Sequence, residues 1–186
     1  MGIRVMHTEL DGVLIIEPDM FHDERGFFLE TYHQARYAEH GIACTFVQDN
    51  HSQSRYGVLR RLHYQSLAAP MAKLVRCSSG TILDVVVDLR VGAPSFGRWL
   101  TVELSATNAR QLFVPVGFAH GFVTHSEVAE IQYKCSGYYT PTAEGAVRWD
   151  DPELGVVWAV SNPIVSARDQ AAQSFAAYRT HPAFVF

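Results

Sequence analysis

Cysteine is scarce in this sequence, and its spacing excludes the structures that cysteine usually builds. Only Cys44, Cys77 and Cys135 are present, and none of them belongs to a Cys-x-x-Cys pair. An odd number of widely spaced cysteines implies neither a disulfide framework nor a zinc knuckle. The fold must therefore be held together by its apolar core.

Long apolar runs and an excess of basic residues are also missing. Val13–Ile16 is the one apolar run near the N-terminus, too short for the core of a signal peptide, and no stretch approaches the length of a membrane span. The formal net charge of -4 gives no reason to expect a nucleic-acid partner. These observations predict a cytoplasmic protein that binds neither membrane nor nucleic acid.

What the chain does contain is apolar and aromatic residues in short segments. With 186 residues, of which 48% are hydrophobic, one domain with a sizeable core is expected over residues 1–186. Gly- and Pro-containing turns separate β-type segments about every 8–12 residues, which predicts an all-β sandwich or barrel. The expected strands are 12–18, 27–32, 57–65, 72–76, 81–89, 99–104, 111–114, 121–124, 129–134, 145–149 and 156–158. A helix is expected over 33–40, ended by Gly41, and a short one within 165–178.

Two successive strands carry unusual numbers of polar residues. The apolar stretch Gly57–Gln65 includes Arg60, Arg61 and His63, and the cluster Gln48–Ser52 follows a short apolar run just before it. Burying an unpaired polar group costs about 1–3 kcal/mol, so a buried strand of this kind is more typical of a site than of plain core. We expect a cavity lined by the side chains of these strands.

Ionisable side chains in apolar contexts are the candidates for chemistry. They are His63, Lys73, Asp84, His120, Tyr133 and Asp169. Each alone is more commonly structural, but their occurrence on successive β segments favours a single barrel interior. Arginines facing such a cavity suit a phosphate, whereas Arg76, Arg90 and Arg98 are expected to be solvated at strand edges.

The segment Pro115–His120 looks like half of the metal-binding signature of cupin barrels. The other half would supply a His-x-His pair and a nearby glutamate, but here His63 is followed by no carboxylate before Asp84. Two histidines without further ligands make a poor metal site. The sequence thus predicts a cupin-like double-stranded β-helix, a jelly-roll barrel with a few short helices, that uses no metal and no cofactor. Histidine, tyrosine and lysine around a cavity suit proton transfer next to a carbonyl group.

At these residues the chain resembles the dTDP-4-dehydrorhamnose 3,5-epimerase family, cupin-fold enzymes of nucleotide-sugar metabolism. The likeness extends over nearly the whole chain. Its ordered blocks are 21–28, 48–52, 57–65, 73–76, 84–90, 115–122, 133–139, 148–152 and 166–169. The resemblance implies an epimerase that inverts C5 and C3 of dTDP-4-dehydro-6-deoxy-D-glucose through an enolate.

The resemblance also implies a role for each matched residue. His63 would be the base, oriented by Asp169, with Tyr133 as the acid on the other face of the sugar and Lys73 stabilising the enolate. Substrate binding would involve Arg25, Glu30, Gln48, Asn50, Arg60, His120, Tyr139, Glu144 and Arg168. In the family, the segment with Arg25 and Glu30 is lent to a neighbouring subunit, which implies a homodimer with an exchanged N-terminal segment.

One residue departs from the pattern of the family, which usually has glycine where this chain has Arg61. In strict alternation Arg61 would share the face of His63, whereas a β-bulge would turn it outward. Because Arg60 and His63 are both expected inside, alternation already fails, and we favour the bulge. An added cation near the sugar or phosphates would point to a different nucleotide sugar.

Several alternatives remain open at this point. Relatives with the same residues invert only C3 or only C5, or act on another nucleotide-linked 4-keto sugar. A cupin that merely binds a sugar nucleotide would keep the arginines without needing His63, Tyr133 and Asp169 together. A metal-dependent cupin oxygenase would need the ligands that the sequence lacks.

Overall fold

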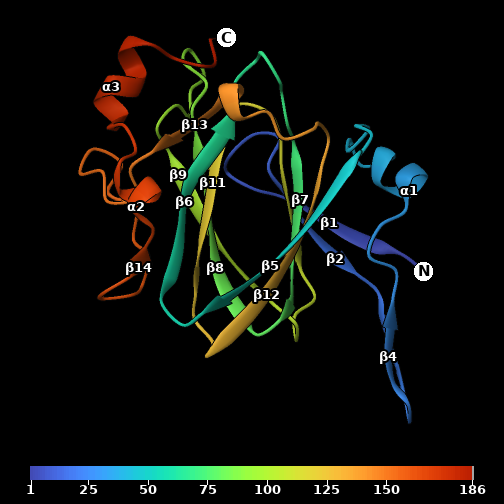
Figure 1. Cartoon of the computed structure of the whole chain (residues 1–186). Coiled ribbons are helices and arrows are strands. Elements are labelled where there is room, and N and C mark those ends of the chain that lie inside the picture. The colour runs from blue at the N-terminus through green and yellow to red at the C-terminus, as the bar shows by residue number, and fades with distance from the viewer. Residues whose placement is uncertain (186) are drawn as a thin grey trace.

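Two β-sheets face each other in the computed structural model, which describes residues 1–185 (Figure 1). The first sheet has the strand order β1-β2-β10-β7-β12-β5, and the second has the order β13-β6-β11-β8-β9, with β14 parallel to β6. The strands of the first sheet are β1 (Ile3–His7), β2 (Leu14–Pro18), β5 (Gln48–Arg55), β7 (Lys73–Ser79), β10 (Gln111–Val114) and β12 (Val128–Cys135). Those of the second are β6 (Val58–Gln65), β8 (Thr81–Asp88), β9 (Trp99–Ser105), β11 (Phe118–Thr124), β13 (Glu144–Val147) and β14 (Ile164–Val165).

The remaining elements are a hairpin and four short helical segments. The hairpin pairs β3 (Met20–Asp23) with β4 (Gly26–Leu29). The helical segments are α1 (Gln34–Ala38), the 3₁₀ turn η1 (Pro141–Ala143), α2 (Ala167–Gln170) and α3 (Phe175–Thr180). The predicted all-β, cupin-like jelly-roll barrel with a few short helices is confirmed.

The strand β8 explains how the second sheet is buried on both faces. Val86 packs between the sheets, while Val85 and Val87 face the C-terminal segment on the outside, and all three are fully buried. The sequence of a strand that is covered on both faces is a continuous apolar run, and here the run consists of β-branched residues. The prediction of a central strand over 81–89 is confirmed.

The C-terminal segment covers the outer face of the second sheet (Figure 1). Trp158, Phe175 and Tyr178 are buried there. The prediction of a strand at 156–158 is wrong, because this segment pairs with no strand and packs the ring of Trp158 onto the sheet. The indole Nε1 of Trp158 donates a hydrogen bond to the carbonyl of Trp149 at 2.7 Å. The region 165–178 holds two short helices where one was expected.

On the first sheet, α1 covers the outer face around Tyr37, which is fully buried against Leu74 and Phe113. The helix ends at Ala38, before the predicted end at residue 40. Gly41 follows the helix with a φ of +86°, the left-handed conformation that glycine adopts easily. There the N–H of Ile42 donates to the carbonyl of Tyr37 at 3.1 Å. The strands β1 and β3 were not predicted.

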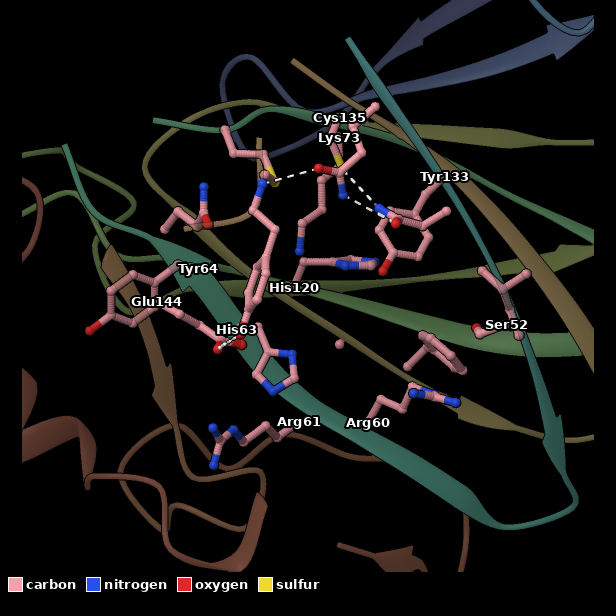
Figure 2. Close-up of a pocket in the computed structure, with 18 of the residues that line it drawn as sticks. Ser52, Arg60, Arg61, His63, Tyr64, Lys73, His120, Tyr133, Cys135 and Glu144 are labelled. Carbon is pink, nitrogen blue, oxygen red and sulfur yellow. Dashed lines mark hydrogen bonds between the residues drawn. The ribbon is translucent and has the colours of Figure 1, made fainter. Parts of the chain in front are cut away.

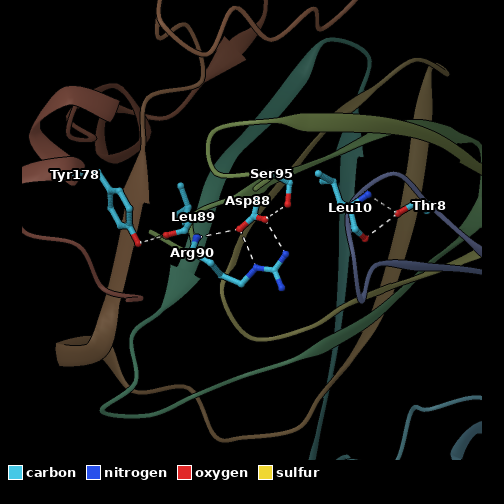
Figure 3. A network of polar contacts seen from close by, with 7 residues as sticks. All are labelled: Thr8, Leu10, Asp88, Leu89, Arg90, Ser95 and Tyr178. Carbon is cyan, nitrogen blue, oxygen red and sulfur yellow. Dashed lines mark hydrogen bonds and ion pairs between the residues drawn. The ribbon is translucent and has the colours of Figure 1, made fainter. Parts of the chain in front are cut away.

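A polar network fixes the loop after β8 (Figure 3). The fully buried carboxylate of Asp88 accepts hydrogen bonds from Arg90 Nε at 2.9 Å and from Ser95 Oγ at 2.6 Å. The guanidinium of Arg90 also lies 4.3 Å above the ring of Phe118. The expectation that Arg90 is solvated is therefore wrong, and Arg76 is likewise half-buried, whereas Arg98 is exposed and paired with Glu9.

The hairpin β3–β4 projects away from the two sheets (Figure 1). Its aromatic residues Phe21, Phe27 and Phe28 are 49%, 63% and 60% exposed. Aromatic side chains gathered on such an arm are typical of an interaction surface. Within residues 1–185, no helix has the length and apolar character needed to cross a membrane.

Candidate active site

A polar cavity of about 380 Å³ opens between the two sheets (Figure 2). Strands of both sheets line it, as the two polar strands predicted. The predicted site residues that line it are Gln48, Asn50, Arg60, His63, Lys73, His120, Tyr133, Tyr139, Glu144 and Arg168. The cavity therefore gathers the candidate groups that are far apart in the sequence.

The strands β6 and β11 place two histidines next to each other. His63 pairs with His120 across these strands, but Phe122 pairs with Arg60, so two residues of β6 lie opposite Gly121 alone. This is the predicted β-bulge, and it lets both Arg60 and His63 line the cavity in spite of their odd spacing.

The bulge does not turn Arg61 out into solvent, and that part of the prediction is wrong. Its side chain is only 8% exposed and stays at the edge of the cavity, with Nε 3.3 Å from Oδ1 of Asp169. Its Nη1 donates a hydrogen bond to the carbonyl of Arg168. Nearby residues of the short helix α2 neutralise the cation, so it faces α2 rather than the cavity centre.

His63 stands beside a carboxylate from the C-terminal segment. Its Nε2 lies 3.4 Å from Oδ1 of Asp169, whose side chain is 10% exposed. Burial lowers the pKa of His63 to about 4, and the cations of Lys73 and Arg61 add to this effect. The carboxylates of Asp169 and Glu144 oppose it. The imidazole is therefore neutral, and able to accept a proton, at neutral pH.

His120 has a carboxylate partner of its own. Its Nε2 lies 2.9 Å from Asp84, which is fully buried on β8. Asp84 is two residues from Val86, the β8 residue that pairs with His120, so the two side chains are diagonal neighbours on one face. Burial raises the pKa of Asp84, while His120 and Lys73 act in the opposite direction.

Lys73 and Tyr133 enter the cavity from the first sheet, opposite β6. Figure 2 shows their side chains converging with that of His120 in the space above His63. Burial lowers the pKa of Lys73 and raises that of Tyr133. Lys73 lines the cavity, so its ammonium protons can reach a bound molecule.

The rim of the cavity is built by residues of the loop after β12 and by α2. The hydroxyl of Tyr139 donates to Glu144 Oε2 at 2.9 Å, and the same oxygen accepts from the guanidinium of Arg168. The backbone N–H of Tyr139 donates to Gln48 Oε1 at 3.0 Å, and Gln48 Nε2 donates to Asn50 at 3.1 Å. An exposed aromatic ring beside an exposed guanidinium can hold a base and a phosphate.

Three predicted site residues do not line the cavity of this chain: Asp169, which lies next to His63, and Arg25 and Glu30. Arg25 is exposed on the hairpin and paired with Asp23, and Glu30 pairs with Arg36 next to α1.

Ser52, a member of the polar cluster Gln48–Ser52, also lines the cavity. So do Met71 and Cys135, which the sequence did not single out. Only the alternation of Cys135 with Tyr133 along β12 could have indicated one of them.

The histidines do not form part of a larger metal-ligand cluster. In the part of the chain that the structure describes, no group of three or more His, Cys, Asp or Glu side chains is arranged to hold a metal ion. Each cavity histidine instead faces one carboxylate. Such pairs are the arrangement of a general base and of a hydrogen-bonding group.

The cavity of this cupin-like barrel contains two histidines, each next to a carboxylate, together with a lysine and a tyrosine. These groups define an enzyme that works by acid–base catalysis. The model of the dTDP-4-dehydrorhamnose 3,5-epimerase family matches residues 7–177. The chain belongs to this family.

Individual relatives are similar over most of their length. The chain is 52% identical to the dTDP-4-dehydrorhamnose 3,5-epimerase of Salmonella typhimurium (strain LT2) over 170 residues, 90% of this chain and 93% of that protein. A solved structure of the dTDP-6-deoxy-D-glucose-3,5-epimerase from Legionella pneumophila, in complex with dTDP-4-keto-L-rhamnose, is 45% identical with a TM-score of 0.90 and covers 92% of both chains. The 4-keto-6-deoxy sugar epimerase NovW of Streptomyces spheroides is 37% identical with a TM-score of 0.95, over 100% of this chain and 94% of that one.

Proposed function

We propose that this protein inverts C5 and C3 of dTDP-4-dehydro-6-deoxy-D-glucose to give dTDP-4-dehydro-L-rhamnose, without a metal or cofactor. The observation that carries the proposal is the placement of a base and an acid on facing sheets. His63, backed by Asp169, lines the cavity from the second sheet, and Tyr133 lines it from the first. The relatives with this activity in their names support the choice of substrate.

His63 removes the proton from the carbon next to the ketone. Its Nε2 faces Asp169, so Nδ1 is the ring nitrogen that receives the proton. The imidazole is neutral before the step because burial lowers its pKa to about 4. After the step the Asp169 carboxylate stabilises the imidazolium, as the orienting acid does in other His–Asp pairs.

Lys73 and Tyr133 complete the proton transfer. The ammonium of Lys73 stabilises the enolate oxygen at C4, and its lowered pKa means that it shares its proton readily with that oxygen. Tyr133 then donates a proton to the other face of the ring. Its phenol is protonated at neutral pH because burial raises the pKa.

The remaining cavity residues hold the nucleotide and the sugar. Arg60 and Arg168 suit the diphosphate, and Tyr139 suits stacking on the base, with Gln48 and Asn50 beside it. His120, whose partner is Asp84, is placed to hold the sugar. Glu144 keeps Tyr139 and Arg168 in position through one carboxylate oxygen.

The active form is a homodimer in which the N-terminal segment is exchanged between subunits. The exposed aromatic residues of the hairpin β3–β4 support this, as does the distance of Arg25 and Glu30 from the chain's own cavity. The protein acts in the cytoplasm, where the free cysteines Cys44, Cys77 and Cys135 remain reduced.

The test is the reaction itself in deuterated water. Incubation with dTDP-4-dehydro-6-deoxy-D-glucose is expected to introduce deuterium at both C3 and C5 and to form the L-sugar, followed by NMR. The variant His63→Asn is expected to lose exchange at both carbons by about 10²–10⁴-fold, because a general base contributes that much.

The exposed strand residue His7 offers a matched control, and His7→Asn is expected to react like the unchanged protein. Label at one carbon only would show a single-carbon epimerase in place of the proposed one. Near-normal exchange by His63→Asn would exclude His63 as the base, and loss of activity on chelation with recovery on adding a divalent ion would exclude a metal-free reaction.

A further inference from the structure

Arg61 is a buried cation that the proposed reaction does not use. It lies in the bulge of β6, where the chain has one residue more than the opposing strand β11. Its side chain is 8% exposed, so the charge has to be compensated by protein groups. Both partners come from α2: the carbonyl of Arg168, which accepts a hydrogen bond from Nη1, and the carboxylate of Asp169.

The helix α2 is short, and besides Arg61 it is held by the ion pair of Arg168 with Glu144. It consists of a single turn, Ala167–Gln170, and its N-cap Ser166 accepts a hydrogen bond from the N–H of Asp169 at 3.1 Å. The preceding strand β14 pairs with β6 only over two residues. A charge-assisted contact from Arg61 to the backbone and to a side chain of α2 therefore fixes the part of the chain that carries Asp169.

One carboxylate oxygen of Asp169 has two cationic or potentially cationic neighbours. Oδ1 lies 3.3 Å from Nε of Arg61 and 3.4 Å from Nε2 of His63. A permanent cation on this oxygen weakens its attraction for a second positive charge. Arg61 therefore makes the imidazolium form of His63 less favourable, both directly and through Asp169.

The charged and titratable groups around His63 come from several elements. His120 on β11 is its cross-strand neighbour and is itself paired with Asp84 on β8. Lys73 on β7 and Arg61 on β6 itself disfavour the protonated form of His63, and Asp169 on α2 and Glu144 on β13 favour it. Glu144 is also engaged by Arg168, so its oxygen is partly compensated as well. Among these groups, Arg61 is the one that contacts Asp169 and has no part in the proposed binding of the substrate.

We propose that Arg61 is a positioning residue which holds Asp169 against His63. By sharing the carboxylate of Asp169, Arg61 also allows His63 to abstract a proton at lower pH than it otherwise would. The inference rests on the proposed function, in which His63 is the base. It also gives Arg61 a role other than the recognition of a different nucleotide sugar.

The test compares Arg61→Gln with the unchanged protein by two measurements. The first is the titration of His63 in the free protein, followed by the NMR signals of its ring. The second is the pH dependence of kcat/KM on dTDP-4-dehydro-6-deoxy-D-glucose, which reports ionisations of the free enzyme. Removing the cation is expected to raise the pKa of His63 and to move the acid limb of kcat/KM to higher pH by the same interval. Each unit of that shift lowers the activity on the acid side about tenfold. KM is expected to stay unchanged, because Arg61 faces α2.

Two further variants control for structure and charge. Arg98→Gln removes a cation from an exposed ion pair with Glu9 and is expected to change neither measurement. Arg61→Lys keeps the positive charge but cannot reproduce both the hydrogen bond to the carbonyl of Arg168 and the ion pair with Asp169, so its acid limb is expected to stay close to that of the unchanged protein while kcat falls. Because Arg61→Lys preserves the charge, it also serves as the test if Arg61→Gln does not fold.

The possible results are distinguishable. An unchanged His63 titration in folded Arg61→Gln, or an acid limb of Arg61→Lys that moves as far as that of a neutral variant, overturns the inference alone. A large rise in KM with an unmoved acid limb also overturns it, because Arg61 would then bind the substrate. A shifted titration without a matching shift of kcat/KM overturns the assignment of His63 as the base, and the inference with it.

Discussion

In the proposed mechanism, Tyr133 is the residue on which inversion, as opposed to simple proton exchange, depends. Exchange at a carbon next to a ketone needs only a base that removes and returns a proton on one face. Inversion needs a donor on the other face of the ring. Tyr133 reaches the cavity from β12 in the first sheet, and His63 reaches it from β6 in the second. The raised pKa of the buried phenol keeps it protonated.

We expect Tyr133→Phe to lose net epimerisation by about 10²–10⁴-fold while deuterium exchange at C3 and C5 falls much less. The substitution keeps the aromatic ring and removes only the hydroxyl, so folding should change little. Deuterium incorporation and product formation are measured by NMR on the same sample. Tyr138 is 69% exposed, and Tyr138→Phe is the matched control. Equal losses of exchange and product would mean that the proton comes from another group.

The sequence predicted which side chains line the cavity wherever a polar side chain interrupts an apolar strand. His63, Lys73, His120 and Tyr133 were found in this way, and all line the cavity. The role of Asp169 came from the resemblance to the family and not from its local sequence. The contact between Arg61 and α2 could not be predicted, because it joins segments that are far apart in the chain and depends on how a single helical turn is placed.

The bulge between β6 and β11 is the element that allows the site to form. Strict alternation would put Arg60 and His63 on opposite faces of the strand. The bulge shifts the register between His120 and Phe122 by one residue and brings both side chains to the cavity. Gly121 is the residue of β11 that faces the extra residue, and its backbone approaches β6 closely.

We expect Gly121→Ala to destabilise the protein by about 1–3 kcal/mol, as overpacking usually does. A Cβ at this position would lie 2.6 Å from the carbonyl oxygen of Arg60 and 2.8 Å from the carbonyl carbon of Arg61. Both are backbone atoms that cannot turn away. Urea unfolding gives the free energy, and the loss of kcat should exceed what the unfolded fraction explains. An unchanged stability would mean that the bulge can widen without cost.

At the level of elements, the sequence predicted the strands that lie between clear glycine and proline turns. It missed β1, which has ordinary composition and gains its order from pairing with β2 over Ile3–His7. It also assigned 156–158 to a strand, although that segment contributes its apolar side chains to an outer sheet face. Short apolar segments can pair with a strand edge or pack on a sheet face, and composition alone does not separate these outcomes.

At the scale of the whole molecule, we expect the hairpin β3–β4 to contact a second subunit. It carries Arg25 and three exposed phenylalanines away from the barrel (Figure 1). If it completes the cavity of a partner, each site in the proposed dimer combines His63 of one chain with Arg25 of the other. A closed two-fold assembly of this kind repeats the same exchange in both directions.

Mixed dimers test this exchange directly. His63→Asn lacks the base, and Arg25→Ala lacks the hairpin cation, so each variant alone is expected to be strongly impaired. When the two chains are unfolded and refolded together in equal amounts, a mixed dimer has one site with both defects and one site with His63 and Arg25 intact. Random mixing places the intact combination in about a quarter of all sites, so turnover should rise to about that fraction of the unchanged protein. Light scattering confirms that the mixture is dimeric, and each variant refolded alone is the control. If the hairpin served its own chain, every site would keep one defect, and mixing would restore nothing.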